Sequence, residues 1–366
     1  MVHQRSAAMI GTLLLLWAVP VGGGIASFTP LGDFEGGTFS SAATDVSDDG
    51  TVVVGVGQGE DNLSMGFYWT AASGLMATGQ RDIEAVSADG RVTLGQVGFT
   101  AARWTEAGGL EILGRLHPSL RTYGKDLSAD GSIAVGYAYD HWPQPGGGLV
   151  ELRYAVVWDE EGAPTVVWQP GRGQQFDQSQ VDAITPDGDV IVGRDIGMDD
   201  FQYMRISTGM MVDVGCNQIH AVSDDGAVLL GCGPYKWTLD GASEFLGDLP
   251  GGSTGGAAYG MNADGSVIVG KSRTDNGDEA FIWDQAHGMR NLKTVLETEH
   301  GLNLADWQLY HAIAMSPDGQ NIVGMARNPQ GDNEAYLVTI RNPLLCPGDA
   351  DYDDHVDFED LNLVLA

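Results

Sequence analysis

Acidic residues near the C-terminal end of the sequence alternate at a spacing that suits a hard cation. With Asp349 as position 1, carboxylates fall at positions 1, 3, 5, 9 and 12, and position 7 offers a backbone carbonyl. This alternation aims successive carboxylates at one centre, and Ca²⁺ takes about six to eight oxygen ligands. Leu361, Leu363, Val364 and Leu365 follow the loop and suit a helix start. The spacing therefore predicts a calcium loop.

The segment resembles one half of a type I dockerin, including the lead-in Cys346-Pro347-Gly348. By that resemblance the metal ligands are Asp349, Asp351, Asp353, the carbonyl of His355, Asp357 directly or through water, and Asp360. Position 6 departs from the pattern, because Asp354 stands where a glycine usually supplies positive φ. A dockerin has two such repeats and this sequence shows one, so we expect a partial module. Its implied partner is cohesin-like, and an unstructured acidic tail is the alternative.

The overall composition indicates the kind of protein that carries this segment. The chain has 366 residues, 50 Asp and Glu against 18 Lys and Arg, a net charge of −32, and 53 glycines. This acid excess argues against nucleic acid and anionic membranes as partners, since both require clustered basic residues. A hydrophobic content of 43% supports a large core, and the abundant glycine indicates many tight turns, as in an all-β protein.

A repeat dominates the sequence after residue 30. Asp-Gly followed five residues later by a second Gly occurs seven times, beginning at Asp49, Asp89, Asp130, Asp187, Asp225, Asp264 and Asp318. Successive first glycines lie 40, 41, 57, 38, 39 and 54 residues apart, so the unit is about 40 residues with two insertions. Asp-Gly predicts a two-residue hairpin, because both residues tolerate positive φ.

Each unit contains signals for four strands. A short strand leads into Asp-Gly, a β-branched strand such as 51–54 follows, an aromatic-rich strand such as 66–69 comes third, and a fourth begins near a glycine. Four strands per 40 residues are typical of a β-propeller blade. We therefore predict an all-β, seven-bladed β-propeller. An open β-solenoid, or two smaller sheet domains, is the competing prediction.

The two ends of the repeat region predict how the ring closes. The seventh unit stops after its third strand, Ala335-Tyr336-Leu337-Val338, and Phe28-Thr29-Pro30-Leu31-Gly32 resembles a fourth strand. Pairing of these N- and C-terminal strands closes the ring and removes exposed sheet edges.

The repeat units resemble the HAF family of extracellular repeats over roughly residues 28 to 340. The sixth unit matches best, through Leu246-Gly247-Asp248-Leu249-Pro250-Gly251-Gly252 and Glu279-Ala280-Phe281-Ile282-Trp283. The fourth unit departs from the pattern, with Gln202-Tyr203-Met204-Arg205 where Trp is expected, and the second has a shortened loop. The resemblance implies secretion and a repeat fold, and brings no catalytic residues.

The N-terminal segment predicts export. Arg5 is the only charged residue before Asp33, and an apolar run from Ala7 to Val21 follows it. The small residues Gly24 and Ala26 fit signal-peptidase cleavage after Ala26, so we predict a signal peptide over 1–26, a propeller over 27–341 and the calcium segment over 342–366. The protein is then extracellular or at the cell surface. An uncleaved membrane anchor is the alternative.

Insertions and cysteines supply the remaining candidate features. Insertions lie at about 138–153, with His141 and Trp142, at 168–180, and at 292–310, with Trp307. Long loops on a rigid scaffold are where binding would sit, although ordinary loop variation explains any single residue more simply. Cys216 and Cys232 are either a disulfide after export or buried free thiols, and Cys346 is left over.

No catalytic residue is predicted. Residues 251–255 of the sixth repeat fit a nucleophile-elbow pattern, but neither the strand before it nor the helix after it is signalled. Residues 265–272 of the same repeat fit a phosphate-loop pattern, but 266–269 are a β-branched strand and not the required loop. The leading functional hypothesis is a secreted, non-catalytic repeat protein that binds a carbohydrate or protein and carries a calcium-binding attachment tail. An extracellular polysaccharide-degrading enzyme or accessory subunit is the alternative, and a structural matrix protein is the third hypothesis.

Overall fold

The computed structural model describes residues 26–143, 149–168, 179–195, 200–213, 218–252 and 255–341. The predicted signal peptide and every predicted calcium ligand, from Asp349 to Asp360, lie outside these residues. Within them, 28 strands accompany one short α-helix and one 3₁₀ turn.

The strands form seven antiparallel sheets of four, which we call blades 1 to 7. Blades 1 to 3 contain β2 (Ala42–Val46), β3 (Val52–Gln58), β4 (Ser64–Thr70) and β5 (Gly74–Ala77); β6 (Arg81–Val86), β7 (Val92–Val97), β8 (Thr100–Thr105) and β9 (Gly109–Ile112); and β10 (Arg121–Leu127), β11 (Ala134–Pro143), β12 (Leu149–Trp158) and β13 (Pro164–Trp168). Blades 4 and 5 contain β14 (Ser179–Ile184), β15 (Val190–Asp195), β16 (Asp200–Arg205) and β17 (Met210–Asp213); and β18 (Ile219–Val222), β19 (Val228–Gly231), β20 (Tyr235–Thr238) and β21 (Ser243–Phe245). Blades 6 and 7 contain β22 (Ala257–Met261), β23 (Val267–Thr274), β24 (Gly277–Asp284) and β25 (Gly288–Asn291); and β26 (Gln308–Met315), β27 (Asn321–Arg327), β28 (Asn333–Ile340) and β1 (Ala26–Gly32).

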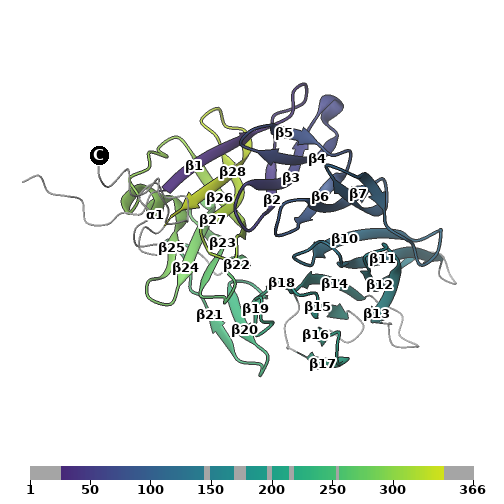
Figure 1. Cartoon of the computed structure of the whole chain (residues 1–366). Coiled ribbons are helices and arrows are strands. Elements are labelled where there is room, and N and C mark those ends of the chain that lie inside the picture. Colours follow the sequence, from purple (N-terminus) through teal and green to yellow (C-terminus); the bar gives the residue numbers. More distant parts are fainter. Residues whose placement is uncertain are drawn as a thin grey trace, which may run out of the picture.

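The blades surround a common axis, with β2, β6, β10, β14, β18, β22 and β26 innermost (Figure 1). The predicted seven-bladed β-propeller is therefore confirmed. Blades 2 and 4, whose sequences depart from the repeat pattern, still have four strands each.

The ring closes through the first and last strands. β1 pairs antiparallel with β28, from Ala26 opposite Ile340 to Gly32 opposite Ala335. The Phe28 ring lies 4.9 Å from that of Trp307 and stacks on Tyr336 at 5.6 Å. The predicted closure is confirmed, and aromatic contacts cover the joint.

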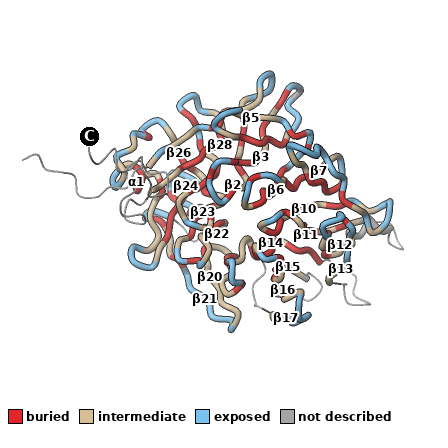
Figure 2. The backbone as a smooth tube through the Cα atoms, viewed as in Figure 1, coloured by how far each residue is buried: buried red, intermediate tan, exposed pale blue. Residues whose placement is uncertain are grey.

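The core lies between blades and not within any one of them. One cluster joins Leu94 and Leu113 of blade 2 to Ala134 and the fully buried Trp158 of blade 3. Figure 2 shows buried residues along the strands and exposed residues along the connecting turns. Each sheet buries its faces against two neighbours, so blade packing and ring closure are coupled.

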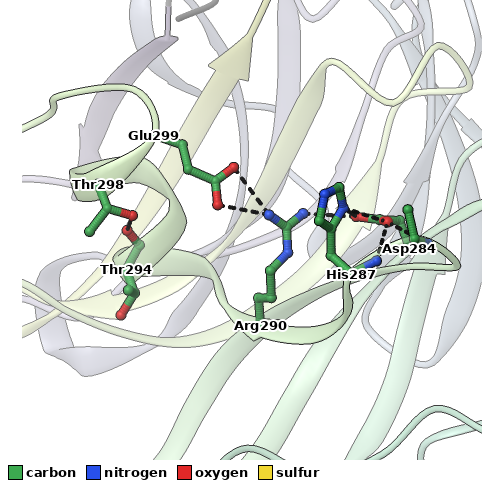
Figure 3. A network of polar contacts seen from close by, with 7 residues as sticks. Asp284, His287, Arg290, Thr294, Thr298 and Glu299 are labelled. Atoms are coloured by element: carbon green, nitrogen blue, oxygen red, sulfur yellow. Dashed lines mark hydrogen bonds and ion pairs between the residues drawn. The ribbon is translucent and has the colours of Figure 1, made fainter.

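The insertion at 292–310 covers the closing blade. It contains α1 (Leu292–Thr298), which begins at Asn291, whose side chain accepts a hydrogen bond from the Thr294 N–H at 3.0 Å. Arg290 ties the segment down by donating to Asp284 and Glu299, both at 2.8 Å (Figure 3). Trp307 in this insertion is half-buried against Phe28, so it belongs to the packing.

The Asp-Gly turns differ from the predicted two-residue hairpins. Ser47 N–H donates to the Val52 carbonyl across four intervening residues, and only Gly50, at φ +71°, has positive φ in this turn. Asp49 instead accepts from the Ser47 hydroxyl at 2.8 Å and from the Thr51 N–H at 2.9 Å. The two-residue prediction is wrong, because a side-chain cap on a wider turn replaces the second left-handed residue.

Neighbouring turns are joined at this face by backbone hydrogen bonds. The N–H of Asp48 donates to Ala88 of the next blade, Ala88 to Ala129, and Ala129 to Pro186, at 2.8–3.0 Å. A second run links Asp224, Ala263 and Pro317. Each run ends at a proline because proline has no N–H.

Each innermost strand contains a bulge opposite or close to the second glycine of the repeat. In blade 3, Gly124 pairs with Gly136 and Asp126 with Val135, so Lys125 has no partner residue across the ladder. A one-residue skip also occurs in β2, β14, β18 and β22, whereas β26 has two such skips and β6 a wider irregularity between Arg81 and Ala85. A Cβ on Gly136, Gly231 or Gly324 would lie within 3.0 Å of a carbonyl oxygen of that strand. The second glycine is therefore required where the bulge brings the two backbones together.

We expect Gly324→Ala to lower the free energy of unfolding by about 1–3 kcal/mol, because the new methyl group meets the His311 carbonyl and cannot rotate away. Gly95→Ala is the matched control, since its nearest neighbours lie at 3.2 Å. Urea unfolding followed by Trp fluorescence measures both variants. Equal losses of unfolding free energy in the two variants would contradict a specific requirement for glycine at position 324.

Candidate functional site in the central cavity

The innermost strands enclose a cavity of about 560 Å³ on the ring axis. The bulge in each strand aims a side chain at this cavity, so every blade contributes one residue at an equivalent position. These seven residues are Thr44, Glu84, Lys125, Asp182, His220, Tyr259 and Ile313. Bulges often redirect side chains in this way near functional sites. The residue set is polar and mixed in charge, which suits recognition of a polar ligand.

Blades 2 to 4 place a charged network along one side of the cavity. Lys125 Nζ lies 3.1 Å from Glu84 Oε2. Burial lowers the pKa of Lys125, but attraction to Glu84 outweighs this effect and leaves the pKa above its ordinary value. Gln180, only 7% exposed, accepts at Oε1 from Arg153 at 2.7 Å and from Arg194 at 3.0 Å. Its amide N–H donates to Asp182.

Two further aspartates lie deeper along the innermost strands and join adjacent blades. Asp45 accepts from the N–H groups of Val46 and Val86, both at 2.8 Å. Asp126 accepts in the same way from Leu127 and Ile184. Burial raises the pKa of Asp45 to about 7, and those of Asp126 and Asp182 to about 6.

These raised pKa values predict that stability falls as the pH rises. Between about pH 4 and pH 7 the folded protein holds protons on Asp45 and Asp126 that the unfolded chain has released, so deprotonation in this window favours unfolding. We expect a lower urea midpoint at pH 8 than at pH 5. Surface aspartates with lowered pKa values, such as Asp130, make stability rise with pH, but only at pH values below the ordinary pKa of an aspartate.

The control is the variant Asp45→Asn with Asp126→Asn, which removes the titration. Each asparagine keeps only one of the two carboxyl oxygens that accept backbone N–H groups, so both midpoints fall and the comparison uses the difference between them. We expect a smaller difference between the two midpoints. A variant that retains the full pH dependence would assign the effect to other groups.

An aromatic row runs along blade 3 toward the face opposite the Asp-Gly turns, which we call the hairpin face because the second and third strands are joined there. Tyr123 stacks on Tyr137 at 5.2 Å and on Tyr139 at 5.4 Å. The Arg121 guanidinium lies 4.1 Å above the ring of Phe99, which is 52% exposed. We call these five residues the tyrosine ladder.

Blades 5 to 7 hold a second polar cluster near the cavity. Lys271 Nζ lies 2.8 Å from Asp278 Oδ2, which also contacts His311 Nε2 at 3.4 Å. The Tyr259 ring lies edge-on to His220 at 5.1 Å. Burial lowers the pKa values of His220 and His311, so both imidazoles are neutral at pH 7.

The structure places few of the residues predicted from sequence in this site. The insertion at 138–153 lies in the long hairpin of β11 and β12, and His141 and Trp142 belong to β11. Residues 169–178 of the next insertion lie outside the described residues. Residues 265–272 form a turn and part of strand β23, as the repeat predicts. Cys232 is disulfide-bonded, which favours the disulfide alternative. In the described part of the chain, no group of three or more His, Cys, Asp or Glu side chains is arranged to hold a metal ion.

Sequence reasoning missed the seven cavity residues, although a signal for them exists. They stand three residues before the Ser, Thr or Asn that opens each Asp-Gly turn. This position differs in every unit, whereas the surrounding positions repeat. A position that varies inside a regular repeat indicates a side chain that does not pack in the core formed by the repeated positions.

Comparisons with known proteins identify no family for this chain. No family model and no curated protein matches the chain. Among solved structures, Kuenenia stuttgartiensis hydrazine synthase is 14% identical, with a TM-score of 0.46 over 82% of this chain and 95% of that one. A structure assigned as TolB from Agrobacterium tumefaciens is 16% identical, with a TM-score of 0.42 over 73% and 94%.

The β-propeller domain of Cps50 (Swd1) from Myceliophteria thermophila is 11% identical, with a TM-score of 0.48 over 86% of this chain and 100% of that domain. Likenesses at this level say nothing about function. No helix in the described ranges is long and apolar enough to cross a membrane.

Proposed function

We propose that this chain is an exported, non-catalytic binding protein whose propeller takes a carbohydrate at the tyrosine ladder and the adjoining cavity. The tyrosine ladder is the observation that carries the proposal. Sugars offer apolar C–H faces and a rim of hydroxyls, and they need flat aromatic surface beside hydrogen-bonding groups. Here Tyr137 and Tyr139 lie next to Arg153 and Gln180, which supply those groups.

The polar contacts in the cavity support binding over catalysis. The carboxylates of Asp45 and Asp126 already accept backbone N–H groups from neighbouring blades, and Glu84 pairs with Lys125. Groups engaged in this way hold the scaffold rigid, which favours a preformed binding site.

Export and calcium-dependent attachment are proposed from the two ends of the chain. The apolar N-terminal segment supports export, and the disulfide at Cys232 agrees with an oxidising compartment. The segment from Asp349 to Asp360 would bind calcium and attach the propeller to a cohesin-like or other extracellular partner.

A glycan array followed by calorimetry tests the binding proposal. We expect Tyr137→Ala and Tyr139→Ala each to weaken the Kd about tenfold, a loss of about 1.4 kcal/mol, because a stacking surface is removed. Phe245→Ala is the matched control, since this aromatic is 46% exposed on the outer strand of blade 5. Unchanged affinity in both tyrosine variants, or binding of protein ligands alone, would contradict the proposal.

A hydrolase acting on polysaccharide is the second candidate, favoured by one observation. Asp182 lines the cavity with a pKa of about 6, which suits a general acid at mildly acidic pH. Release of reducing sugar from a polysaccharide that the protein binds, lost in Asp182→Asn, would favour this candidate. Binding without release supports the non-catalytic protein.

The calcium proposal is tested by titration of the exported form with CaCl₂. We expect a saturable heat that disappears when Asp349→Ala and Asp351→Ala are combined, because two of the carboxylates are lost. A protein ending at Arg341 is the control for binding elsewhere. Heat that persists in either variant would place calcium on another part of the molecule, and no heat in the parent would remove the tail as a metal site.

A further inference from the structure

We infer that the cavity wall between blades 3 and 4 is a carboxylate-binding subsite, so that the ligand is an acidic carbohydrate containing uronic acid. This inference rests on the proposed carbohydrate-binding function and specifies the substrate class of the same site. It follows from where a strongly acidic protein places its few cations.

Basic residues are scarce in this chain but gather around this wall. The sequence has 18 Lys and Arg against 50 Asp and Glu, yet blades 3 and 4 bring Lys125, Arg153 and Arg194 around Gln180 and Asp182. Lys125 is the bulge residue of β10, and Arg194 of β15 also lines the cavity. Asp45, Glu84, Asp126 and Asp182 line the same cavity, so the contacts of each cation, and not the net charge, decide whether it can bind a further anion.

Two guanidinium groups converge on one neutral acceptor. Arg153 and Arg194 both donate to Gln180 Oε1, at 2.7 and 3.0 Å. The amide orientation is fixed because Gln180 Nε2 donates to Asp182. Two like charges this close repel each other; Asp182 offsets part of the repulsion, and a further anion would offset more of it.

Arg194 also has a donor to spare. Its Nε is buried and has no hydrogen-bond partner within the described residues. A buried donor of a charged group that is left unsatisfied is destabilising. A carboxylate oxygen entering the cavity would supply the missing acceptor.

Asp182 attracts Lys125, Arg153 and Arg194, but none of the described acids accepts a hydrogen bond from Arg194 Nε. Glu84 lies against Lys125, Asp182 accepts from Gln180, and Asp45 and Asp126 hold backbone N–H groups of neighbouring blades. Arginine's planar fork matches a carboxylate through two parallel hydrogen bonds. The tyrosine ladder begins at Tyr137, over which Arg153 lies at 4.9 Å. A sugar ring stacked on the ladder would therefore direct a carboxylate on its edge toward these arginines.

The test compares three oligosaccharides: one with carboxylates, one without charge and one with sulfates. Calorimetry of the full chain uses an oligogalacturonide, the same oligosaccharide after reduction of its carboxyl groups, and a sulfated oligosaccharide of similar length. We expect the oligogalacturonide to bind at least tenfold more tightly than the other two. Arg194→Gln should reduce this affinity about tenfold and reduce the affinity for the uncharged sugar much less.

Two further variants keep the test decisive. Arg153→Lys retains the charge but loses the fork, so it should weaken the acidic ligand even if Arg194→Gln unfolds. Arg91→Gln is the matched control, because this arginine is largely exposed on an Asp-Gly turn at the opposite face.

Equal affinity for charged and reduced sugars overturns the carboxylate subsite while carbohydrate binding stands, and preference for the sulfated ligand also overturns it. Absence of binding to every glycan contradicts the proposed function itself.

Discussion

The close approach of the first two strands in blades 1, 3, 5, 6 and 7 is the constraint on which the rest of the structure depends. A glycine in the second strand lets a carbonyl of the first strand come where a Cβ would otherwise stand, as at Gly136 and Gly231. The extra residue of the bulge is then turned toward the axis. One local steric fact, repeated around the ring, thus shapes both the blade and the wall of the cavity.

The ring converts these local features into a rigid frame. Turns are linked by backbone hydrogen bonds, Asp45 and Asp126 join neighbouring blades, and β1 completes blade 7 under Trp307. Because each hydrophobic cluster is shared by two blades, no blade buries its faces alone. A frame of this kind can hold charged groups in fixed positions, which is the property that the network around Gln180 requires.

Burial gives the cavity its chemistry. The same surroundings that raise the pKa of Asp45 to about 7 also strengthen the attraction between Lys125 and Glu84 and leave Arg194 with an unsatisfied donor. These groups would be ordinary on an open surface. Enclosed by seven strands they form a selective, partly unsatisfied lining, and that lining supports the proposal of an acidic sugar as ligand.

The sequence by itself determined the number of blades, the order of the strands and the closure by Phe28 to Gly32, because hydrophobic period, turn residues and repeat length are local properties of the chain. It also indicated a turn at each Asp-Gly, but the predicted two-residue hairpin was wrong, because side-chain caps close a turn of four residues. Only the tertiary structure decided which residues meet in the cavity. Thr44, Glu84 and Lys125 are some 40 residues apart in sequence, and their meeting depends on bulges and blade packing that no single unit specifies.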